Sequence, residues 1–192
     1  MNKVEELASK MRGYVDALSY TELRSPYLSA PEVGEVRSVL AEVVALYEPI
    51  ASLRNIGLRI ETRPRQIGEV SRSSLLVVLT TLLSYAIHGT RAGETIEIDV
   101  EVAERRPLEL EHTDCVQIVV NAPGCAFFGS QSLERCDVPS LADPTILEGM
   151  QVALVCSSLC RVGGGKVEFS APEVPVGHAV VYWPIVEMAA EL

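Results

Sequence analysis

Apolar and polar positions follow two different periods along the chain, one typical of helices and one typical of strands. Apolar residues recur every three or four positions in three stretches, which predicts helices at about 34–53, from Ser71 or Ser73 onward, and at about 147–162. The first predicted helix carries on one face Val36, Leu40, Val43, Tyr47 and Ile50. The second carries Leu75, Leu79, Leu82, Leu83 and Ala86.

Strand periodicity fills the stretches between these helices. Residues 95–102 alternate strictly between polar and apolar, which predicts a strand with one face on a core and one in water. The apolar run at 115–121 predicts a second long strand, antiparallel to the first. Shorter strands are expected at 56–62, 166–170 and 178–183, and the three glycines at 163–165 suit a left-handed helix cap.

These elements together predict an α+β fold. We expect a two-layer α/β sandwich, in which a mixed, mostly antiparallel sheet is covered on one face by three helices. An additional N-terminal helix precedes this unit. Its apolar residues have the 3–4–3–4 spacing of a helix that packs on another helix, at Val4, Leu7, Met11, Tyr14 and Leu18.

The N-terminal helix has two interpretations. It packs on its own domain, or it forms a homodimer with a second copy. Pro26 and Pro31 end it, because proline supplies no N–H and disfavours helix in the residue before it. We therefore expect a dimerisation-type helix and linker at 1–25 and one domain at 26–192.

Composition narrows the class of protein. The 192 residues are 48% hydrophobic, enough for one core, but no apolar run approaches 18 residues, so we expect no membrane segment. A net charge of −10 would repel phosphate backbones, which argues against nucleic acid as a partner. The start of the chain lacks an apolar signal core, and the five cysteines show no metal-ligand spacing. We expect reduced thiols and a cytoplasmic location.

The order of elements resembles that of one signalling family. LLVVLTTLLSYAIHGTRAGETIEIDVEV at 75–102 is similar to the central helix and following strand of the ATP-binding domain of sensor histidine kinases. KMRGYVDALSYTELRS resembles the end of the dimerisation hairpin, and GGGKVEFS through GHAVVYWPI resembles the end of the ATP-binding domain. The resemblance implies the two-layer fold shared with gyrase-type ATPases.

Three motifs hold Mg-ATP in that family, and each departs from its pattern here. Where the resemblance implies Asn-Leu-x-x-Asn-Ala, with the second Asn coordinating magnesium, this chain places Tyr85, whose phenol is a poor ligand for a hard cation. Where it implies Asp-x-Gly-x-Gly, with the Asp accepting a hydrogen bond from adenine, we align Asn121, Pro123 and Gly124.

The third motif, Gly-x-Gly-Leu-Ala, begins a helix that cradles phosphate on its N–H groups. We align Gly149 with the first glycine and Gln151 with the second, while a shift by one residue would lose both. The sequence thus predicts a vestigial nucleotide pocket, no bound cofactor, no metal site and no catalytic residue; ATP with Mg²⁺ stays the alternative.

We interpret the histidines and two of the cysteines as structural residues rather than as catalytic or metal-binding ones. None of the three histidines, His88, His112 and His178, is followed by the acceptor pattern Asp/Glu-x-x-x-Pro, so we interpret them as surface or turn residues. Cys156 and Cys160 share an apolar helix stripe and are read as core. The loop at 122–147, with Phe127 and Phe128, stands where the family has its ATP lid; it covers the pocket, binds a partner, or packs on itself.

The sequence therefore predicts a non-catalytic, pseudokinase module for protein interaction or regulation in two-component-like signalling, with a kinase or response regulator as partner. Two alternatives stay open. One is a divergent active ATP-dependent kinase, of the histidine or the anti-sigma serine type. The other is a histidine phosphotransfer protein, which would need an acceptor histidine and a first hairpin helix that this chain lacks.

Overall fold

The computed structural model describes six stretches of the chain: 33–63, 68–104, 107–110, 114–125, 144–169 and 176–186, with side chains left undescribed at 144–147 and 176. Several predictions from the sequence lie outside these residues and stay predictions. They are the N-terminal helix and the homodimer through it, the boundary between 25 and 26, the location of His112, and the contacts of Phe127 and Phe128.

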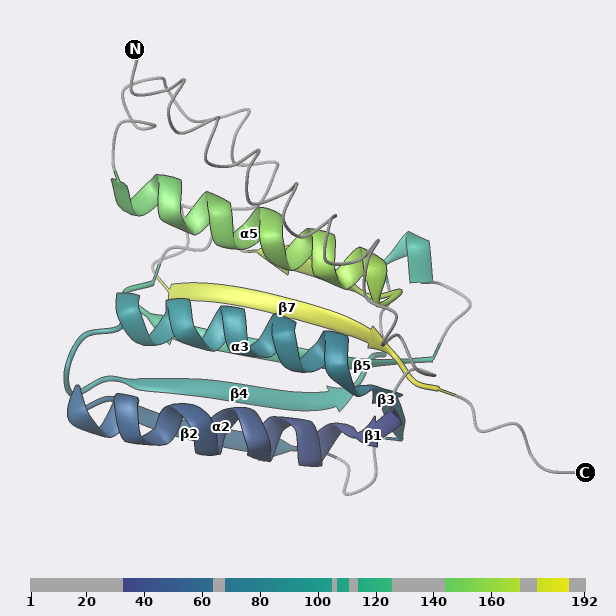
Figure 1. The fold of residues 1–192 in the computed structure, drawn as a ribbon, viewed down its shortest axis with the longest axis horizontal. Coiled ribbons are helices and arrows are strands. Elements are labelled where there is room, and N and C mark those ends of the chain that lie inside the picture. Colours follow the sequence, from purple (N-terminus) through teal and green to yellow (C-terminus); the bar gives the residue numbers. More distant parts are fainter. Residues whose placement is uncertain are drawn as a thin grey trace, which may run out of the picture. The chain divides into compact units, whose positions relative to one another are not determined.

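A five-stranded sheet forms one layer (Figure 1). Its strands are β2 (Gly57–Thr62), β4 (Thr95–Val102), β5 (Cys115–Pro123), β7 (Val176–Pro184) and β6 (Lys166–Phe169), in that spatial order. The β2–β4 pair is parallel and the other three pairs are antiparallel. The predicted mixed, mostly antiparallel sheet is confirmed.

Three helices form the second layer and cover one face of the sheet (Figure 1). They are α2 (Val36–Leu53), α3 (Arg72–Gly89) and α5 (Pro144–Val162). Two further elements were not expected from the sequence: a two-stranded antiparallel sheet of β1 (Val33–Glu35) and β3 (Glu69–Ser71), and a short 3₁₀ helix at Leu108–Leu110. The predicted two-layer sandwich is confirmed.

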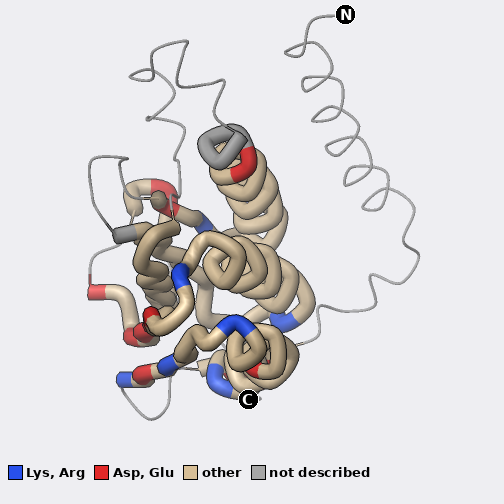
Figure 2. Tube along the Cα trace, turned by 90° about the vertical axis from the view of Figure 1, so that its left-hand side faces the viewer, with Lys and Arg blue, Asp and Glu red and all other residues tan. Residues whose placement is uncertain are grey.

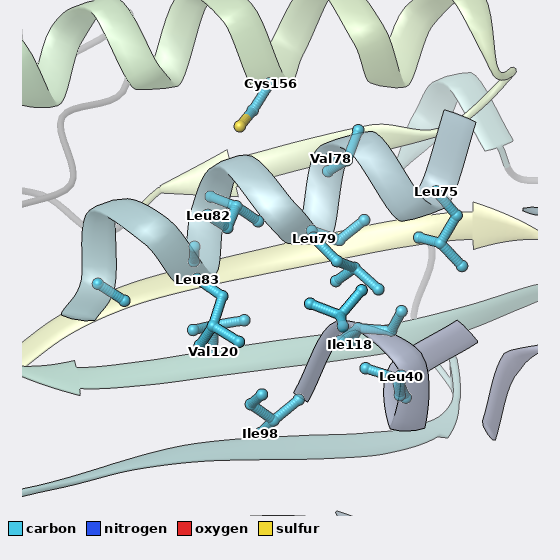
Figure 3. Close-up of a cluster of buried hydrophobic side chains, with 14 of the residues drawn as sticks. Leu40, Leu75, Val78, Leu79, Leu82, Leu83, Ile98, Ile118, Val120 and Cys156 are labelled. Carbon is cyan, nitrogen blue, oxygen red and sulfur yellow. The ribbon is translucent and has the colours of Figure 1, made fainter. Parts of the chain in front are cut away.

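The core lies between the two layers. Leu79 and Leu83 of α3 lie over Ile118 and Val120 of β5, and Cys156 of α5 points toward α3 (Figure 3). The inward-facing positions on the strands alternate as predicted, and they include Ile96, Ile98, Val100, Val116, Ile118, Val120, Ala179, Val181 and Trp183. Burial of this apolar area is the main force that holds the layers together.

Two residues of the predicted core faces are exposed. Ile50 is 44% exposed near the end of α2, where its neighbour Ala51 is buried instead. Val102 is 39% exposed at the end of β4. All of the core positions predicted for α3 are buried.

The triple glycine ends α5 as predicted. Gly164 has a φ of 77°, and the N–H of Gly165 donates to the carbonyl of Cys160 at 2.7 Å, which closes a left-handed cap. A Cβ at Gly163 would lie 2.4 Å from the Trp183 ring, and one at Gly165 would lie 2.7 Å from it. The glycines therefore also make room for the fully buried indole.

Candidate functional site

Three segments meet at one end of the sandwich: the last turn of α3, the end of β5 and the beginning of β7. The Sγ of Cys125 lies 4.0 Å from the carbonyl oxygen of Tyr85. A Cβ added to Gly177 would lie only 2.2 Å from the carbonyl oxygen of Cys125, and one added to Gly89 would lie 3.2 Å from its Cα. The turn after β5 is therefore packed closely between α3 and β7.

Tyr85 is buried at this junction, with 7% of the residue exposed. Its burial raises the pKa of the phenol well above the ordinary value of 10, and the nearby Cys125 and Glu148 add to the shift. The side chain is therefore neutral at all physiological pH values. A neutral buried phenol fills space at this junction, and it is a poor ligand for a hard cation.

Asn121 lies on the opposite face of the sheet from Tyr85. Along β5, Ile118, Val120 and Ala122 are buried under the helices, so Asn121 points to the open face. There its Oδ1 lies 2.7 Å from Nδ1 of His178, the residue directly across the ladder on β7.

This placement limits what the second motif can do at the candidate site. A residue that shares a pocket with Tyr85 must point toward the helix layer, and the neighbours of Asn121 that do so on β5 are Val120 and Ala122, both buried. Neither has a side-chain acceptor for an adenine amino group. Asn121 itself points to the open face, away from Tyr85.

Pro123 and Gly124 form the turn that leaves β5. The N–H of Cys125 donates to the carbonyl of Ala122 at 3.1 Å, and Gly124 has a φ of 77° that favours glycine. A Cβ at Gly124 would lie 3.4 Å from the carbonyl oxygen of Gly89 on α3. Gly124 therefore allows a close backbone approach, as the family's glycines do, but the group that approaches it is the α3 backbone.

Gly149 and Gln151 lie inside α5, since this helix begins at Pro144, earlier than the predicted start near residue 147. Proline is favoured in the first turn, where its missing N–H costs nothing. The N–H groups without a helical acceptor belong to the first four residues, so those of Gly149 and Gln151 are used within the helix. The aligned positions therefore do not provide a phosphate cradle at a helix start.

His178 was interpreted as a surface or turn residue, but it lies within β7 and is partly buried. Burial lowers the pKa of its imidazole below the ordinary value. His88 is exposed in the last turn of α3, where Nδ1 lies 2.7 Å from the carbonyl oxygen of Ser84. Its expected surface position is confirmed.

Cys156 and Cys160 are fully buried and confirm the core interpretation. Burial raises the pKa of the Cys160 thiol to about 12, and it raises that of Cys156 further, so neither is a reactive thiolate. Among the described residues, no cluster of three or more histidine, cysteine or acidic side chains has metal-binding geometry. None of the described helices combines the length and apolarity that crossing a bilayer requires.

Two hollows are lined by described residues. One, of about 420 Å³, lies between the end of α2 and the starts of β2 and β4, and the other, of about 280 Å³, lies on the open face of the sheet near Asp99. Neither is lined by any of the six aligned motif residues. Of these residues, Tyr85 and Gly149 are buried, and Asn121 is directed to the open face of the sheet.

Solved structures of histidine kinases share this fold. The cytoplasmic segment of histidine kinase QseC is 15% identical, with a TM-score of 0.59, over 94% of this chain and 95% of that one. The catalytic domain of histidine kinase ThkA is 20% identical, with a TM-score of 0.56, over 80% and 95%. A histidine kinase from Burkholderia phymatum is 17% identical, with a TM-score of 0.59, over 95% of both chains.

The chain has the fold of the catalytic domain of histidine kinases, as its sequence predicted. ThkA has also been solved in complex with the response regulator protein TrrA, and that ThkA structure is 19% identical, with a TM-score of 0.59, over 95% of this chain and 49% of that one. No protein-family model matches the chain, and no curated protein matches it by sequence.

Proposed function

We propose that this chain is a non-catalytic histidine-kinase-like domain that acts as an interaction or regulatory module in two-component-like signalling. The single observation that carries the proposal is the apolar lining that β5 turns toward the helix side of the candidate site. Tyr85 stands where the resemblance implies a magnesium ligand, and Asn121, which we align with the acceptor for adenine, points to the open face of the sheet. The β5 residues on the helix side, Val120 and Ala122, supply no oxygen anion or amide side chain to a nucleotide.

Packing at the same place supports the proposal. The Cys125 backbone occupies the space between Gly89 and Gly177, in contact with both. Opening this junction to a ligand would separate well-packed atoms and expose the buried Tyr85 ring, which costs the burial energy of both. A nucleotide would have to supply that free energy without the metal and adenine contacts that hold it in the family.

The proposed partner is based on a complex formed by a protein with the same fold. A solved neighbour with this fold, ThkA, is bound to a response regulator protein, TrrA. A domain with this fold can bind such a partner without binding a nucleotide. We therefore propose a receiver-type signalling protein, or a kinase that acts on one, as the binding partner.

A phosphorylation assay tests the lack of catalysis. The purified chain is incubated with Mg²⁺ and γ-labelled ATP, alone and with a receiver domain, beside an active histidine kinase as the positive control. We expect no label on the chain and none on the receiver. Acid-labile label on the chain would establish the histidine-kinase alternative, and acid-stable label on a protein substrate would establish the serine-kinase alternative.

A further inference from the structure

The outer surface of the helix layer lacks charge over most of its length. Arg72 begins α3, and no charged residue follows it until His88 near the end of the helix. In Figure 2 the charged positions gather on the strands and loops, while most of the helix coils are uncharged. This is the reverse of a usual surface helix, whose outer face is charged.

The neighbouring helices continue this surface on both sides of α3. Leu46, Ile50 and Leu53 lie on the stripe of α2 that begins at Glu42, and the ion pair of Glu42 with Arg72 shows that this stripe borders α3. These three side chains are 60%, 44% and 88% exposed.

On the other side of α3, the α5 stripe Gln151, Val155 and Ser158 follows Glu148 at helical spacing. Helix α5 lies beside α3 in the helix layer (Figure 1), and this stripe is turned away from the buried Cys156 and Cys160. The charged groups thus lie at the ends of the surface, and its middle is free of them.

We call the solvent-facing set between the ends the uncharged helix face: Leu46, Ile50, Val77, Thr81, Val155 and Ser158. Val77 lies at its centre and is 46% exposed. The hydroxyl of Thr81 donates to the carbonyl of Val77 at 2.8 Å, so this polar group is already bonded within the helix. The face therefore offers methyl groups and little unsatisfied polarity to whatever covers it.

We propose that the uncharged helix face is the surface through which two copies of this chain associate. With a net charge of −10, two copies repel each other through most approaches, and the β2–β4 side of the open sheet face carries Glu61, Glu97, Asp99 and Glu101 against Arg59 and Arg63. The uncharged helix face avoids that repulsion. A two-fold axis across α3 brings the same apolar residues of both copies together, as an isologous interface requires.

The whole outer side of the helix layer, of which the uncharged helix face is the middle part, has the size of such an interface. Helices of 18 or 19 residues are about 27 Å long, and three of them packed roughly 10 Å apart present about 800 Å². A standard interface buries roughly 800 Å² per partner. This inference goes beyond the proposed function and does not depend on the loss of nucleotide binding.

Sedimentation equilibrium on the full chain tests the proposal with two matched substitutions. Val77→Lys places a charge at the centre of the face, and Val102→Lys places the same charge on an exposed valine of β4. We expect the unchanged protein to dimerise, Val77→Lys to weaken the dimer at least about tenfold, which is about 1.4 kcal/mol, and Val102→Lys to leave it unchanged. Circular dichroism checks the fold, and Thr81→Arg replaces Val77→Lys if that variant unfolds.

Several results would overturn the proposal. A monomer at high micromolar concentration would mean that the face is covered by the chain itself or by a different protein. Equal weakening by both substitutions would point to a general charge effect. A dimer that resists Val77→Lys but dissociates with Leu7→Glu and Met11→Glu would be one formed by the predicted N-terminal helix.

Discussion

Nδ1 of His178 lies 2.7 Å from Oδ1 of Asn121, across the ladder between β5 and β7. With the amide oxygen toward the ring, the imidazole N–H donates and the carboxamide accepts. The pair lies on the open face of the sheet, so the residue that chemistry alone would assign to adenine is already engaged within the protein. Asn121 thus bonds to the His178 side chain and contributes no polar side chain to the face of the sheet that packs against α3.

This pair gives a pH-dependent stability. Burial lowers the pKa of His178 below its ordinary value of 6.5 in the folded protein, so between the two pKa values the unfolded chain binds more protons. The free energy of unfolding therefore falls as the pH is lowered from 6.5 through that window. Urea denaturation at about pH 7.5 and about pH 5.5 should show a smaller loss for His178→Gln than for the unchanged protein. Equal losses in both would contradict this.

Tyr85→Asn is expected to destabilise the fold by about 1–3 kcal/mol, because it leaves a polar group where a buried ring packed. It should not restore ATP binding, since Ala122 and the packed Cys125 remain. Tyr85→Phe is the control, and it should cost about 1 kcal/mol or less. Chemical denaturation measures both, and an unchanged midpoint for Tyr85→Asn would mean that the ring contributes no packing.

Gly177→Ala should be strongly destabilising, by about 2 kcal/mol or more. Its Cβ would lie 2.2 Å from the carbonyl oxygen of Cys125 and 2.9 Å from that of Ala122, and backbone atoms cannot move away cheaply. Gly34→Ala meets only the flexible Arg72 side chain, at 3.1 Å, and should cost about 1 kcal/mol or less. A similar melting temperature for the two variants would show that the turn after β5 is loosely packed.

Arg54 joins the ends of α2 and α3. Its guanidinium donates to the carbonyl of Ile87 and, at 3.3 Å, to that of His88, so a cation lies at the negative end of α3. Arg54→Ala should lower stability by about 1 kcal/mol and speed hydrogen exchange in the last turn of α3. Arg59→Ala removes an exposed pair with Glu97 and serves as the control. Equally fast exchange in both variants would mean that the hydrogen bonds from Arg54 do not hold the last turn of α3.

The sequence predicts the layers well because their signal is local. Strict alternation at 95–102 and 115–121 and a helical period around Leu79 each reflect one face on a core, and the structure has these elements where expected. The β1–β3 pair was not predicted, since three-residue strands carry too little periodicity. Pairing of β2 beside β4 depends on long-range packing, which a single sequence does not encode locally.

The candidate site was harder to predict than the fold. Matching by residue chemistry assigned Asn121 to the acidic position, whereas the period of the strand through Ile118, Val120 and Ala122 places Asn121 on the open face. A shift of one residue in a strand reverses the face, so the physical criterion decides. The start of α5 at Pro144 likewise moved Gly149 from a helix start to a helix interior, because an element boundary is the least local part of the pattern.

The absence of nucleotide binding is the central claim, and isothermal titration with Mg-ATP and Mg-ADP tests it most directly. We expect no magnesium-dependent affinity tighter than about 1 mM, which corresponds to roughly −4 kcal/mol. An active histidine kinase catalytic domain titrated under the same conditions is the positive control. A micromolar dissociation constant that disappears when the metal is chelated would contradict the account and favour a working kinase.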